Sequence, residues 1–118
     1  MKFLIAQKEY LIALDATEIL TGLIPADIDT CSMVELSAKL RETHWDLVLL
    51  DTTEAPDEDR RNASMVLASG AGLVFLTGYS EFAGGVPAFE EWPVVTKPFM
   101  DSQLLDAVLR SLHLVGKS

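Results

Sequence analysis

The chain has 118 residues, of which 49% are hydrophobic, and a formal net charge of −9. This length and composition predict one compact domain, residues 1–118, with enough apolar side chains to bury a core. The negative charge argues against binding to nucleic acid or to an anionic membrane surface, because both need clustered Lys and Arg, and the single Cys31 excludes an internal disulfide.

The first half of the chain alternates short apolar runs with segments of helical periodicity. Ser32 to Glu35 have the form of a capping box, which predicts that a helix begins there. The run from Leu47 to Leu50 does not alternate, and this indicates a strand that is buried on both faces. The patterns together predict strands at residues 2–6, 27–31 and 45–51 and helices at residues 10–23 and 32–42.

The second half continues the alternation with one irregular segment. Three acids at residues 57–59 favour a helix N-terminus, and that helix runs to about Ser69. Strands are predicted at residues 73–76 and 94–96. Glycines and a proline disfavour a long helix between residues 78 and 92. A last helix begins at Asp101 or Ser102, with an apolar stripe formed by Leu104, Leu105, Val108, Leu109 and Leu112.

Strands that alternate with helices predict a (βα)5 domain of the α/β class. Right-handed crossovers place the helices on both faces of a doubly wound, five-stranded parallel sheet. The flavodoxin-like strand order 2-1-3-4-5 is expected, with a fourth helix that is short or irregular. The apolar runs are too short for a membrane span and the first residues do not resemble a signal peptide, so we expect a cytoplasmic protein.

Polar side chains end three of the predicted strands. Asp51 ends the third strand, Thr77 the fourth, and Lys97 follows the fifth. The carboxyl ends of parallel strands meet at one edge of a sheet, where open sheets form their sites. A carboxylate nucleophile, a hydroxyl and an ammonium at one place suit a phosphoryl group. Each position alone is explained better by a strand that ends in water, so the combination of all three carries the prediction.

The residues around these positions resemble the receiver domain of bacterial response regulators, along almost the whole chain. Residues 45–51 are similar to the strand that ends in the phosphorylated aspartate, and Thr77 matches the family's threonine or serine. Lys97 and Pro98 match its Lys-Pro pair, in which the peptide bond before the proline is typically cis. The resemblance implies a non-enzymatic two-component signalling domain with Asp51 at the phosphoacceptor position and Thr77 and Lys97 in contact with the phosphoryl group.

A shorter motif resembles one subgroup of receivers. Residues 75–79, Phe-Leu-Thr-Gly-Tyr, are similar to the Phe-x-Thr-Gly-Tyr motif of an alphaproteobacterial group. That resemblance implies a histidine kinase of the HWE/HisKA2 type, a phosphotransfer protein or another regulator as partner. A homodimer through the last helix is a further expectation from the family.

The family's metal-binding acid pair is replaced here by Gln7 and Lys8. Mg²⁺ prefers carboxylate and phosphate oxygens, so weak or absent Mg²⁺ binding and no cofactor are expected. Two alternatives remain for Lys8: its ammonium lies near Asp51 and replaces the metal, or it points into solvent. Three nearby acids are weaker candidates for compensation: Glu9, Asp15 and Glu54.

The family's aromatic switch position is occupied by Val94, so the usual coupling to an aromatic side chain is lost there. Tyr79 either takes a related role or packs in the irregular segment. The aromatic residues between Ser80 and Trp92 either form a partner surface or cover the edge of the sheet.

Three functions remain open on the sequence. The first is a degenerate receiver that acts as a protein-interaction module, independently of phosphorylation or with weak phosphorylation. The second is a working phosphoacceptor that uses Asp51. The third is a flavodoxin-like small-molecule binder that uses the same strand ends.

Overall fold

The computed structural model describes residues 1–53, 55–78 and 85–116. Five parallel strands form one sheet in the order β2-β1-β3-β4-β5, as the alternating pattern predicted. In chain order the elements of the described residues are β1 (Lys2–Ala6), α1 (Tyr10–Leu23), β2 (Asp27–Cys31), α2 (Leu36–Glu42), β3 (Leu47–Asp51), α3 (Pro56–Ala68), β4 (Gly72–Thr77), β5 (Val94–Thr96) and α4 (Asp101–Leu114).

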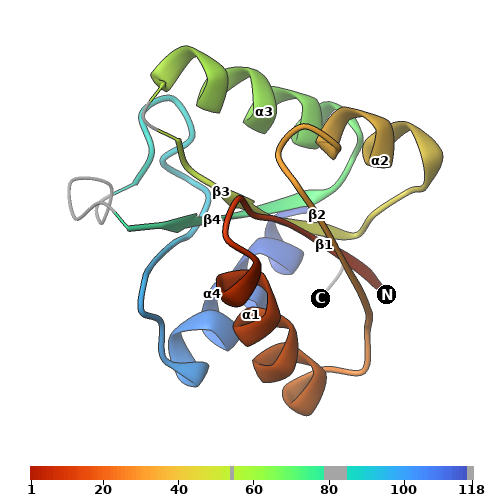
Figure 1. Cartoon of the computed structure of the whole chain (residues 1–118), viewed down its shortest axis with the longest axis vertical. Helices are drawn as coiled ribbons and strands as arrows, with labels where there is room; N and C mark the ends of the chain where they lie inside the picture. Colours follow the sequence, from red (N-terminus) through yellow and green to blue (C-terminus); the bar gives the residue numbers. More distant parts are fainter. Residues whose placement is uncertain (54, 79–84, 117–118) are drawn as a thin grey trace.

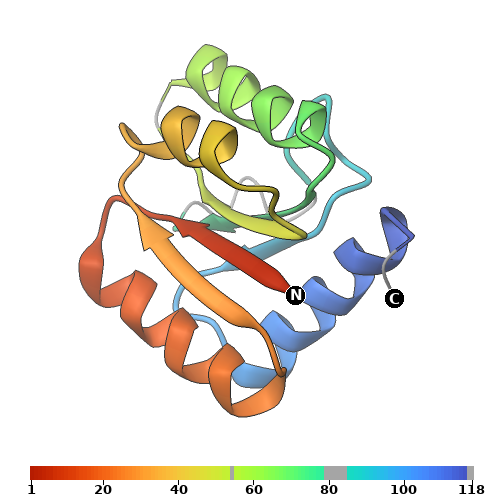
Figure 2. The same ribbon diagram turned by 90° about the vertical axis from the view of Figure 1, so that its right-hand side faces the viewer.

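The helices cover both faces of the sheet, with α1 and α4 on one side and α2 and α3 on the other (Figures 1 and 2). Each side has its own apolar core. Phe3 and Leu49 contribute to the core beneath α1 and α4, whereas Leu4 and Leu50 contribute to the core beneath α2 and α3. Because successive side chains of a strand point to opposite faces, the unbroken apolar runs of β1 and β3 supply both cores at once.

Two helix predictions differ from the structure. The capping box forms, since the Ser32 N–H donates to Glu35 Oε1 at 2.9 Å and the Glu35 N–H donates to Ser32 Oγ at 3.3 Å. Residues 33–35 nevertheless form a turn, and the helix begins at Leu36. In α4, the buried stripe is narrower than the predicted one. Leu104, Val108 and Leu112, which are spaced four residues apart, are buried, whereas Leu109 is 52% exposed.

The connection between β4 and β5 contains no helix in its described part, residues 85–93. Val86 and Trp92 are buried in the core beneath α2 and α3, and Phe89 packs against it. The ring centroids of Phe75 and Phe89 lie 6.2 Å apart. These side chains therefore cover the sheet instead of forming a partner surface. Tyr79 and residues 80–84 lie outside the described residues.

Within the part of the chain that the structure describes, no helix is both long and apolar enough to cross a bilayer.

Candidate functional site

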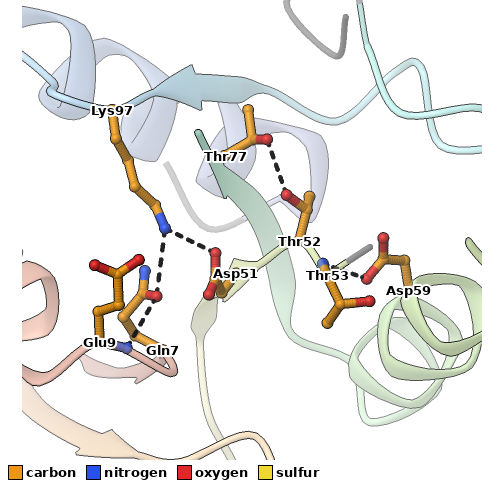
Figure 3. Close-up of polar contacts among 8 residues, drawn as sticks. All are labelled: Gln7, Glu9, Asp51, Thr52, Thr53, Asp59, Thr77 and Lys97. Atoms are coloured by element: carbon orange, nitrogen blue, oxygen red, sulfur yellow. Dashed lines mark hydrogen bonds and ion pairs between the residues drawn. The ribbon is translucent and has the colours of Figure 1, made fainter. Parts of the chain in front are cut away.

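Four polar side chains from four strands meet at the carboxyl edge of the sheet (Figure 3). Gln7 follows β1, Asp51 ends β3, Thr77 ends β4 and Lys97 follows β5. Gln7, Asp51 and Thr77 are 4%, 2% and 0% exposed. The parallel register sets this arrangement, because each strand reaches the same edge before the chain turns into a helix or loop.

An ion pair dominates the site. Lys97 Nζ lies 2.8 Å from Asp51 Oδ1, and the two side chains are 10% and 1% exposed. The backbone holds Lys97 in place, because its N–H donates to the Thr77 carbonyl at 2.7 Å. The peptide bond between Lys97 and Pro98 is cis. With so little water near, the attraction between these charges is several times stronger than that of a surface pair.

Gln7 is the second partner of the lysine. Its Oε1 accepts hydrogen bonds from Lys97 Nζ at 3.3 Å and from the Glu9 N–H at 3.4 Å. An ammonium group only donates, so the amide oxygen must face Lys97. This orientation leaves Gln7 Nε2 without a hydrogen-bond partner among the described residues, and Asp51 Oδ2 is in the same condition.

Lys8 does not share this site. Its side chain is exposed, and the cation beside Asp51 is Lys97. Of the two alternatives for Lys8, the structure therefore agrees with the one that points it into solvent. Glu9 and Asp15 are also exposed, and Glu54 lies outside the described residues.

A pair of buried hydroxyls lies beside the ion pair. Thr52 Oγ1 donates a hydrogen bond to Thr77 Oγ1 at 2.8 Å, and the two residues are 1% and 0% exposed. Sequence reasoning singled out Thr77 and missed Thr52. Its position directly after Asp51, opposite the end of the neighbouring strand, is the signal that would have found it.

A second buried acid lies behind the loop that follows β3. Asp59, in the first turn of α3, is 5% exposed, and its Oδ1 accepts the Thr53 N–H at 2.8 Å. Burial raises the pKa of the Asp59 carboxyl, and the hydrogen bond from Thr53 opposes that shift. The sequence suggested only an acid at a helix N-terminus, because nothing local indicates that its side chain is enclosed.

The residues beside Asp51 do not fit a hard divalent cation. Such an ion needs about six oxygen ligands, several of them charged. Here the oxygen of Gln7 is already bonded to Lys97, and the ammonium repels a cation. Among the described residues no group of three or more His, Cys, Asp or Glu side chains is placed to hold a metal ion.

Comparison with known proteins gives matches in structure alone. No protein-family model and no curated protein matches the sequence. The response regulatory domain of protein mrkE from Klebsiella pneumoniae is 16% identical, with 100% of both chains covered and a TM-score of 0.77.

Two further receivers are similarly close. SdrG from Pseudomonas melonis Fr1, in its BeF3-activated conformation, is 24% identical over 94% of this chain and 95% of that chain, with a TM-score of 0.75. A response regulator receiver protein from Sinorhizobium medicae WSM419 is 22% identical over 98% and 96%, with a TM-score of 0.72. The chain thus has the fold of the response-regulator receiver domains.

Proposed function

We propose that residues 1–118 form a two-component receiver domain that acts as a protein-interaction module without bound Mg²⁺, with Asp51 phosphorylated weakly or not at all. One observation carries this proposal. The Asp51 carboxylate is enclosed and paired with Lys97, which Gln7 holds from the other side. The charge that a metal would balance is therefore already balanced by the chain.

The electrostatics of phosphoryl transfer favour the same conclusion. Transfer to a carboxylate depends on positioning and on neutralising the charge of the phosphoryl oxygens. The ammonium of Lys97 supplies one positive charge, whereas Gln7 is neutral and Lys8 is exposed. Asp51 is also 2% exposed, so a phosphodonor reaches it only after neighbouring side chains move.

Exposed apolar side chains support a protein partner. Tyr10 and Leu11 are 74% and 76% exposed at the start of α1, beside the site, and Leu14 one turn later is 40% exposed. Apolar side chains gathered on a surface are typical of interaction sites. A histidine kinase, with the HWE/HisKA2 type as the first candidate, a phosphotransfer protein or another regulator is the proposed partner.

A magnesium titration followed by backbone amide shifts tests the metal part of the proposal. We expect no saturable shift near Asp51 up to about 10 mM Mg²⁺. Saturation at low millimolar concentration or below would refute it. Asp51→Asn is the control, because it removes the carboxylate that lies at the centre of the site.

The second candidate function is a working phosphoacceptor. Asp51 Oδ2 has no hydrogen-bond partner among the described residues, and this favours it as the reactive oxygen. In transfer from an acyl phosphate, Oδ2 would form a bond to phosphorus while the donor leaves as a carboxylate.

Intact mass after incubation with acetyl phosphate, with and without Mg²⁺, decides between the two candidates. Stoichiometric phosphorylation that is lost in Asp51→Asn would establish the second function.

The small-molecule alternative has less support, since Asp51 and Thr77 are both closed to solvent.

A further inference from the structure

The backbone hydrogen bonding between β3 and β4 continues one residue past Asp51, the last residue of β3. Asp51 pairs with Leu76 in the register of β3 and β4, so the next pair along the two strands is Thr52 and Thr77. The Thr52 N–H donates to the Leu76 carbonyl at 3.1 Å, and its hydroxyl donates to Thr77 Oγ1 at 2.8 Å. Thr52 is thus attached to the end of β4 through its backbone and through its side chain.

The hydroxyl bond is one contact that sets the direction of the Thr77 side chain. Figure 3 shows the Thr77 hydroxyl turned toward Thr52, while the Asp51 carboxylate is turned toward Lys97. Both threonines are closed to solvent, so water is not at hand to replace a lost hydroxyl partner. If Thr77 rotated toward Asp51, the Thr52 hydroxyl would be left buried without this partner, which is unfavourable.

We propose that Thr52 is a positioning residue that holds the Thr77 hydroxyl away from Asp51. The inference rests on the proposed function insofar as it concerns a group bound at Asp51. The hydrogen bond by which Thr52 positions Thr77, called the hold below, involves only the two threonines and needs neither phosphate nor metal. Thr52 therefore biases the domain toward a state in which Asp51 is paired with Lys97 and Thr77 is paired with Thr52.

The test is the rotamer population of Thr77, measured from three-bond couplings of its methyl carbon to the backbone nitrogen and carbonyl carbon. Thr52→Val has nearly the same shape and removes only the hydroxyl. We expect one rotamer in the wild-type protein and a second one in Thr52→Val. The ratio of the two Thr77 rotamers should change about fivefold, which corresponds to the net free-energy contribution of about one buried hydrogen bond.

Two variants serve as controls. Thr52→Ser keeps the hydroxyl and should keep the single rotamer of Thr77. Thr96→Val makes the same chemical change at the residue that pairs with Thr77 from β5, and it should leave the rotamer unchanged. Amide spectra and thermal unfolding confirm that each variant is folded.

The outcomes separate this inference from the proposed function. A second Thr77 rotamer in Thr52→Val, absent from both controls, supports the hold. A single, unchanged rotamer in Thr52→Val overturns it. Tight Mg²⁺ binding in the titration described above would overturn the proposed function and leave the hold of Thr52 on Thr77 intact.

Discussion

Replacing Lys97 with methionine removes the ammonium group from the buried Asp51 carboxylate and keeps most of the side-chain volume. With the two charge centres about 4 Å apart, the lost attraction is roughly 4 kcal/mol at an effective dielectric constant of about 20. Removing one partner of a buried ion pair typically costs about 3–5 kcal/mol, because a charge is left without compensation. We therefore expect Lys97→Met to lower the free energy of unfolding by an amount in this range.

A double-mutant cycle separates the ion pair from the packing of the lysine stem. Asp51→Asn removes the charge at the other end, so the double variant Lys97→Met/Asp51→Asn no longer contains a buried unpaired carboxylate. Urea unfolding of the four proteins should give a coupling energy between the two positions of about 2–3 kcal/mol, at the upper end for residues in contact. The electrostatic account of the site is wrong if Lys97→Met costs less than about 1 kcal/mol and the coupling is zero.

Three further changes test other parts of the structure. Gln7→Asp with Lys8→Asp restores an acid pair, and we expect this variant to give saturable Mg²⁺ shifts and the wild-type protein to give none; unchanged spectra in the variant would contradict the conclusion that Gln7 and Lys8 prevent Mg²⁺ binding. Asp59→Asn removes a carboxyl group whose pKa is raised by burial. Asp59 therefore binds a proton more readily in the folded protein than in the unfolded chain. The free energy of unfolding of the variant minus that of the wild-type protein, measured in urea, should then increase as the pH rises from about 4 toward neutrality. A difference that does not depend on pH would refute the raised pKa of Asp59. Gly72→Ala should destabilise by about 1–3 kcal/mol in thermal unfolding, because its new Cβ would lie 2.7 Å from Ser111 Oγ, and Ser111→Ala should relieve part of that cost.

The sequence by itself determined the fold. The unbroken apolar runs of β1 and β3 indicate burial on both faces, and their alternation with helical segments indicates a parallel sheet covered by helices on both sides. Once the strands are parallel, the residues that end them must share one edge. Asp51, Thr77 and Lys97 could therefore be placed together without a structure.

The contacts within the site were decided by tertiary structure alone. The sequence placed Lys97 at the same edge as Asp51 and left two alternatives open for Lys8. In the structure Asp51 pairs with Lys97, 46 residues further along, and Lys8 is exposed. Likewise, the bond from Thr52 to Thr77, 25 residues away, depends on the pairing of β3 with β4, and nothing local shows that Asp59 is enclosed. The periodicity of a segment fixes which face it buries, but which side chains touch depends on how separate strands and loops pack against one another.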